Sequence, residues 1–89
     1  MFTIHIVGLV NGDSSEFDNK YVKEYDPAYF HQDGYDGGLL DVCDTAAEAK
    51  QFADIKDAMT YYRQSYGTRR DGLPNRPLTA WSVEFEEKL

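Results

Sequence analysis

The C-terminal stretch, residues 71–85, constrains the fold more than any other part of the chain. It contains the only tryptophan and two of the three prolines, Pro74 and Pro77. Each proline fixes its own φ angle and holds the preceding residue in an extended conformation. From position 80 onward, polar residues alternate with the apolar residues Trp81, Val83 and Phe85. This alternation predicts a half-buried strand with large aromatic anchors, and we expect that strand to lie inside a sheet.

Three further strands are predicted upstream, over residues 2–10, 20–25 and 39–42. The first two alternate apolar and polar side chains, which is the pattern of a half-buried strand. A polar run over residues 11–19 separates them. It begins with Asn-Gly, a strong hairpin signal, but the run is longer than a two-residue turn. We therefore expect the first two strands to pair in an antiparallel arrangement.

Two helices are predicted between the third strand and the last. Thr45 and Glu48 match the capping-box pattern, which predicts a helix starting immediately after the threonine. Asp54 can cap a second helix that starts at Ile55, and Gly67 is expected to end it. The order β-β-β-α-α-β predicts an α+β fold, a small and mostly antiparallel sheet with two helices packed on one face.

The chain length of 89 residues predicts a single domain, residues 1–89. Hydrophobic content of 42% and aromatic content of 15% argue against disorder. The single cysteine, Cys43, excludes an intramolecular disulfide and fits a reducing compartment. No apolar run approaches the roughly 20 residues that span a membrane, and the N-terminus lacks the basic region of a signal peptide. We expect a cytoplasmic protein.

The formal net charge is −7, from 16 acidic and 9 basic residues. The acidic excess lies in residues 1–57, which carry 12 Asp and Glu against 4 Lys, whereas residues 58–89 carry 4 against 5 Lys and Arg. Such a chain is repelled by nucleic acids and anionic membranes and is attracted to a basic partner. The alternative interpretation is that the charge only maintains solubility.

Residue types found in catalytic and metal sites occur, but not in patterns that predict such a site. His31, Asp41 and Cys43 include the types of a thiol nucleophile site, yet a cysteine between a strand and a helix is commonly a buried apolar residue. Counted from Asp33, the calcium-loop ligand positions fall on Tyr35, a glycine and an aspartate, so that pattern fails. We expect no catalytic residue, no metal site and no cofactor.

Arg69, Arg70 and Arg76 form a basic cluster around a Gly/Pro loop. A phosphate could bind there, although the sequence contains neither a P-loop nor a GxGxxG motif. The alternative is that these arginines pair with carboxylates and order the loop.

The arrangement resembles small proteins encoded by bacteriophages and prophages. The motif that carries this resemblance most clearly is the segment Asp-Gly-Leu-Pro-Asn-Arg-Pro-Leu-Thr-Ala at residues 71–80, together with Tyr25-Asp26-Pro27. Further residues that carry it are Leu39, Thr45, Ala49, Phe52, Ala58 and Tyr62. Small acidic phage proteins include inhibitors of host defence such as anti-CRISPR proteins, so the resemblance implies a non-enzymatic inhibitor acting in the host cytoplasm, with a CRISPR-Cas effector as one possible target.

We therefore predict a monomer or weak homodimer that binds a basic host protein and competes for its nucleic-acid-binding surface. It would bind neither nucleic acid directly nor membranes. The predicted partner-binding residues are acidic or aromatic: Asp13, Glu16, Asp18, Glu24, Asp26, Tyr29, Phe30, Asp33, Tyr35 and Asp36. Several of them lie in the long loop over residues 26–38, whose aromatics could instead fold back on the core. Two alternatives stay open, a phosphate- or nucleotide-binding domain that uses residues 69–76 and a phage structural or assembly protein.

Overall fold

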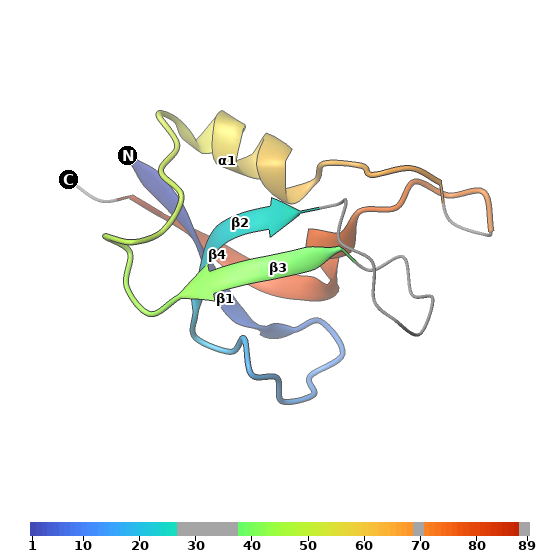
Figure 1. The fold of residues 1–89 in the computed structure, drawn as a ribbon, viewed down its shortest axis with the longest axis horizontal. Coiled ribbons are helices and arrows are strands. Elements are labelled where there is room, and N and C mark those ends of the chain that lie inside the picture. Colours follow the sequence, from blue (N-terminus) through green and yellow to red (C-terminus); the bar gives the residue numbers. More distant parts are fainter. Residues whose placement is uncertain (27–37, 69–70, 88–89) are drawn as a thin grey trace.

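The computed structural model describes residues 1–26, 38–68 and 71–87, which form a four-stranded antiparallel sheet with one α-helix and one 3-10 turn (Figure 1). The strand order is β3-β2-β1-β4, so the first and last strands of the chain are neighbours. The elements are β1 (Phe2–Leu9), β2 (Tyr21–Asp26), β3 (Leu39–Cys43), α1 (Ile55–Tyr62), η1 (Pro77–Ala80) and β4 (Trp81–Glu87).

The pairing of β1 with β4 runs along the whole of both strands, with a register shift between Ile6 and Gly8. The apolar positions of β4 are half-buried and alternate with exposed ones, as the sequence predicts. The prediction that this strand lies inside the sheet is wrong, because β4 is at an edge. Alternation of apolar and polar residues indicates only that one face of the strand is buried. An edge strand can bury one face as well as a central strand can.

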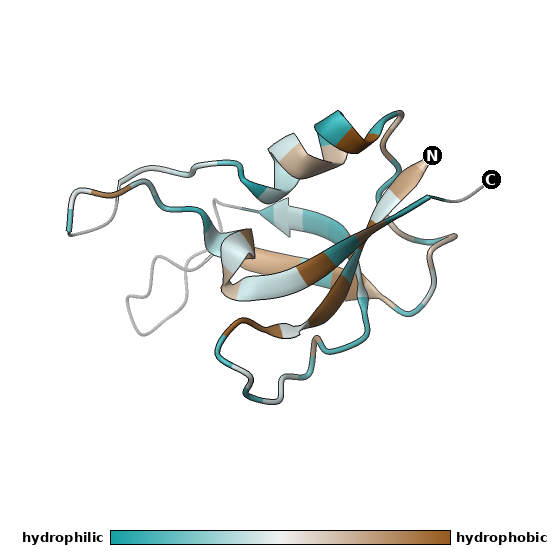
Figure 2. Cartoon of the chain, turned by 180° about the vertical axis from the view of Figure 1, so that it is seen from behind, coloured by the Kyte–Doolittle hydropathy of each residue, from teal (hydrophilic) through white to brown (hydrophobic). Residues whose placement is uncertain are grey.

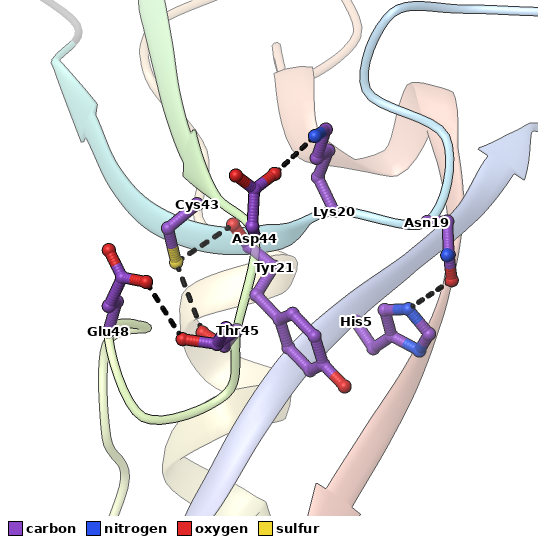
Figure 3. Close-up of polar contacts among 8 residues, drawn as sticks. All are labelled: His5, Asn19, Lys20, Tyr21, Cys43, Asp44, Thr45 and Glu48. Atoms are coloured by element: carbon purple, nitrogen blue, oxygen red, sulfur yellow. Dashed lines mark hydrogen bonds and ion pairs between the residues drawn. The ribbon is translucent and has the colours of Figure 1, made fainter.

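The prediction of two helices packed on the sheet is also wrong, because the described residues form one α-helix and are mostly sheet. The segment after Thr45 makes turns instead of a helix. The Thr45 hydroxyl donates to the Glu48 carboxylate over 2.9 Å, so these two side chains satisfy each other instead of capping backbone amides (Figure 3).

Backbone pairing with the sheet competes with helix formation in this segment. The amide of Lys50 donates to the carbonyl of Val22 over 3.1 Å. Phe2 and Phe52 exchange both backbone hydrogen bonds, at 2.8 and 2.9 Å. These contacts draw the chain alongside β1 and β2 in an extended form, which a continuing helix cannot match.

The second predicted helix is confirmed as α1. The Asp54 carboxylate accepts the amide hydrogen of Asp57 over 3.0 Å and caps its first turn. Ala58 is fully buried in the helix face that packs on the sheet, whereas Ile55 at the start of the helix is 43% exposed. The helix ends at Tyr62 and does not reach Gly67, whose positive φ of 88° serves a turn farther along the chain.

The core lies between α1 and the sheet face that packs against it. Figure 2 shows hydrophobic segments along the strands of the sheet. A register shift in β2 between Val22 and Glu24 lets both Val22 and Tyr25 point inward, although strict alternation would separate them. The buried core residues are Ile4, Ile6, Val22, Tyr25, Leu40, Phe52, Ala58 and Leu78. No helix in the described parts of the chain is long and apolar enough to cross a membrane.

Candidate functional site

The predicted partner-binding residues do not form one cluster. Tyr29, Phe30, Asp33, Tyr35 and Asp36 lie outside the described residues. Those that are described fall into two groups at opposite ends of β2 (Figure 1). Because Glu24 and Asp26 are the fourth and sixth residues of β2, they lie roughly 10–17 Å along the strand from its start, where the loop joins it.

The first group lies in the loop between β1 and β2 and contains Asp13, Glu16 and Asp18. Asp18 is structural, because one carboxylate oxygen accepts the Ser15 amide hydrogen and the other is buried. Asp13 makes a local hydrogen-bonded turn with Asn11, but its side chain stays exposed, as does that of Glu16. Two carboxylates of this loop therefore face solvent and can meet a partner.

The second group, Glu24 and Asp26, lies at the end of β2. Glu24 accepts a hydrogen bond of 3.1 Å from the Tyr61 hydroxyl, and the Lys50 ammonium lies 3.8 Å from it. The Tyr61 hydroxyl in turn accepts the amide hydrogen of Tyr25 over 2.9 Å. Burial first, and the nearby Glu24 carboxylate as well, raise the pKa of Tyr61 to about 12. Glu24 thus helps to fasten α1 to β2.

A cluster that the sequence prediction missed lies where β1 pairs with β4. His5 is directly opposite Glu84, and Glu86 is opposite Thr3, two residues from His5 on the same sheet face. His5 Nδ1 lies 2.5 Å from Glu86 Oε2. One ligand atom from each of His5, Glu84 and Glu86 lies within 4.8 Å of the other two. Two side chains of the last strand therefore converge on a histidine of the first.

The side chains of this cluster are held from both neighbouring strands. His5 stacks on Tyr21 with ring centroids 4.4 Å apart, and its Nε2 lies 2.9 Å from Asn19 Oδ1 (Figure 3). The Tyr21 hydroxyl donates to Glu86 over 3.0 Å, and this hydrogen bond is the main reason that the Tyr21 pKa is raised. Asn19 has a φ of 64°, a conformation that asparagine tolerates better than most residues.

Cys43, weighed from the sequence as a nucleophile, is buried at the end of β3. Its Sγ lies 3.7 Å from the Tyr21 carbonyl and 3.4 Å from the Thr45 carbonyl (Figure 3). Burial raises the pKa of the Cys43 thiol, which lowers the fraction of reactive thiolate. His31, the histidine considered with it, lies outside the described residues.

A shallow, open pocket of about 550 Å³ lies beside the C-terminal half of α1. Three basic side chains line it, Lys56 and Arg63 from the helix and Arg76 from the turn before η1. The predicted basic cluster is therefore only partly as expected. Arg76 lines the pocket together with two helix residues, Lys56 and Arg63, that the predicted basic cluster did not include. Residues 69 and 70 lie outside the described part of the chain.

Comparison of the chain with protein-family models, with curated proteins and with solved structures gave no match.

Proposed function

We propose that this chain is a protein-binding domain whose acidic surface binds the basic, nucleic-acid-binding surface of a partner and thereby inhibits it. The observation that carries this proposal is uncompensated charge. The chain has a net charge of −7, and among the described residues lysine pairs with a carboxylate at two places, Lys20 with Asp44 and Lys50 with Glu24. The excess of 16 acidic over 9 basic residues therefore leaves negative charge that a basic partner can neutralise.

Exposed carboxylates occur on several elements of the domain. They include Asp13 and Glu16 in the loop after β1, Asp41 on β3, and Glu84 and Glu87 on the edge strand β4. Carboxylates distributed over a surface can replace phosphates in contacts with Lys and Arg. Long-range attraction between such surfaces raises the association rate, while well-packed apolar contacts supply most of the affinity. The phage-like segment over residues 71–80 makes a host-defence protein the class of partner to test first.

The test is capture from a bacterial host lysate on the immobilised chain, followed by competitive elution. A DNA duplex is expected to release the captured protein at concentrations where NaCl of equal ionic strength does not. The purified partner should then lose nucleic-acid binding when the chain is added. A partner that binds DNA and this chain simultaneously would contradict the competition mechanism.

Paired variants locate the interface. Asp13→Asn with Glu16→Gln removes two charges from the loop, and Glu84→Gln with Glu87→Gln removes two from β4. At the true interface, neutralisation should slow association more than it speeds dissociation, because these charges steer encounter. The other pair is then the matched control. Equal, small effects of both pairs, together with an affinity that does not change with salt, would refute an electrostatic interface.

The basic pocket favours a second candidate function, binding of a phosphate-bearing small molecule. Lys56, Arg63 and Arg76 are three cations around one pocket in an otherwise acidic protein. Calorimetry with inorganic phosphate and with ATP tests this function. Arg63→Gln should abolish the binding, while Lys23→Gln, an equal charge change at an exposed position of β2, should preserve it. No heat with either ligand at millimolar concentration would eliminate this candidate.

A further inference from the structure

We propose that His5, Glu84 and Glu86 bind a divalent transition-metal ion of the zinc class. This inference does not depend on the proposed function. The site is created by strand register, because β1 and β4 pair so that His5 is opposite Glu84 and diagonal to Glu86 on the same sheet face. Such cross-strand neighbours lie within side-chain reach of one another.

The donor atoms suit such an ion. An imidazole nitrogen and carboxylate oxygens are ligands of zinc at about 2.0–2.2 Å, and a tetrahedral arrangement places two ligands about 3.4 Å apart. One donor from each of the three residues lies within 4.8 Å of the other two. The closest pair, His5 Nδ1 and Glu86 Oε2, is 2.5 Å apart and must separate by about 1 Å to admit the ion. Rotation of the half-buried glutamate side chain can supply that movement.

A second observation also indicates a cation at this point. His5 Nδ1 is shielded from solvent and lacks a hydrogen-bond partner of good geometry, although Glu86 Oε2 is so near. The two carboxylates bring two negative charges to the cluster, which a divalent ion neutralises. A metal ion can bind between a buried nitrogen and the carboxylate oxygens that face it, when no well-aligned hydrogen bond already joins them.

The surrounding contacts have the pattern that orients metal ligands. His5 Nε2 faces Asn19 Oδ1 at 2.9 Å, so that nitrogen carries the proton and Nδ1 is left to bind the metal. Tyr21 stacks on the imidazole ring and donates to the second oxygen of Glu86. The orientation of the imidazole ring is thus fixed before any ion arrives.

The ion would join the edge strand β4 to β1. Three protein ligands leave one tetrahedral position, and Glu84 is exposed, so this position opens to solvent. A water molecule would complete the coordination. Binding should therefore stabilise the fold, since an ion that binds only the folded state shifts the unfolding equilibrium toward it.

The test is calorimetric titration of the full chain with ZnCl₂, with MgCl₂ as a hard-cation control. We expect one zinc ion per chain and a raised unfolding temperature. Glu84→Gln should weaken binding at least tenfold. Glu87→Gln, an equal charge change at another exposed position of the same strand, should alter it less than threefold. Asn19→Gly keeps the positive φ, removes the Nε2 contact, and should cost about 10–100-fold.

Nitrogen-15 NMR of the histidine rings identifies the ligand atom. Zinc should shift Nδ1 of His5 and leave the ring of His31, the other histidine, unchanged. His31→Gln should accordingly retain full affinity. The proposal is overturned if zinc does not bind at millimolar concentration, if His31→Gln abolishes binding, or if Glu84→Gln and Glu87→Gln weaken it equally. In those cases the cluster is a His5–Glu86 ion pair with a purely structural role.

Discussion

Replacement of Gly38 by alanine should destabilise the fold strongly, because two independent features of this position exclude a side chain. Gly38 has a φ of 61°, a conformation that L-residues rarely adopt. A Cβ atom there would also lie 2.1 Å from Oη and 2.5 Å from Cζ of Tyr25, and 2.9 Å from the Asp26 carbonyl oxygen. The tyrosine belongs to the buried core and the carbonyl to the backbone, so neither gives way easily.

The magnitude follows from adding the two costs. The left-handed conformation costs an alanine about 1–2 kcal/mol relative to glycine. Displacing a packed core side chain costs about 1–3 kcal/mol. Tyr25 is only 6% exposed and its ring centroid lies 4.9 Å from that of Tyr66, so a shift disturbs both rings. The expected loss is therefore about 2–5 kcal/mol, a large part of the roughly 4–13 kcal/mol typical of an 89-residue domain.

Urea unfolding followed by far-ultraviolet circular dichroism measures this loss. The matched control is Gly12→Ala, because Gly12 has a φ of 87° but no atom within 4 Å of the added Cβ. That variant should lose only the conformational cost of about 1–2 kcal/mol. Adding Tyr25→Phe to Gly38→Ala removes the nearest atom and should recover part of the difference. If the two glycine variants are equally stable, the steric argument is wrong.

Three further predictions concern the core and the tyrosines. Leu78→Ala should cost about 2–5 kcal/mol in urea unfolding because Leu78 is 3% exposed, whereas Leu73→Ala, at 56% exposure, should change stability by less than about 0.5 kcal/mol. Thr3→Val should leave the free energy of unfolding unchanged or raise it by about 1 kcal/mol, since the Thr3 hydroxyl is buried without a hydrogen-bond partner. If thermal unfolding shows that the variant is instead destabilised by more than about 1 kcal/mol, the hydroxyl has a partner. The Tyr61 pKa is raised to about 12, so the folded state holds this proton more tightly than the unfolded chain does. The stability that this group contributes should be fully present below about pH 10 and be lost as the pH rises toward 12. Tyr61→Phe should therefore reduce the fall in urea midpoints measured between pH 10 and pH 12.

The sequence predicted best those features that depend on neighbouring residues. The Asp54 cap and the start of α1 rest on interactions within one turn, and the structure confirms both. The pairing of the first two strands likewise follows from the single polar connection between them, and β1 and β2 are antiparallel. Local chemistry dominates in such elements, so the pattern of the sequence is sufficient to identify them.

Predictions failed where distant backbone groups compete with a local signal. Thr45 and Glu48 bond to each other through their side chains instead of capping backbone amides, and Lys50 and Phe52 bond to β2 and β1. These backbone hydrogen bonds to the sheet outweigh the local preference for a helix. The strands that accept these bonds, β1 and β2, are distant from Thr45 in the sequence, so the residues around Thr45 do not predict this pairing.

The His5–Glu84–Glu86 cluster was missed for a related reason. The alternation of β4 placed both glutamates on one face, and that of β1 placed His5 on the polar face. The missing fact was that the first and last strands are neighbours. The register that brings His5 opposite Glu84 joins residues 79 positions apart in the chain, since 84 − 5 = 79. Composition and periodicity do not report such a pairing.

Glu84 connects the two proposals, because the same carboxylate would serve the acidic surface and the metal site. A bound divalent ion neutralises the charge that attracts a basic partner. If the partner binds at β4, zinc and the partner must weaken each other's binding by the same factor, as thermodynamic linkage requires. If the partner binds instead at the loop of Asp13 and Glu16, the two affinities are independent. The effect of zinc on partner affinity thus distinguishes the two surfaces without any mutation.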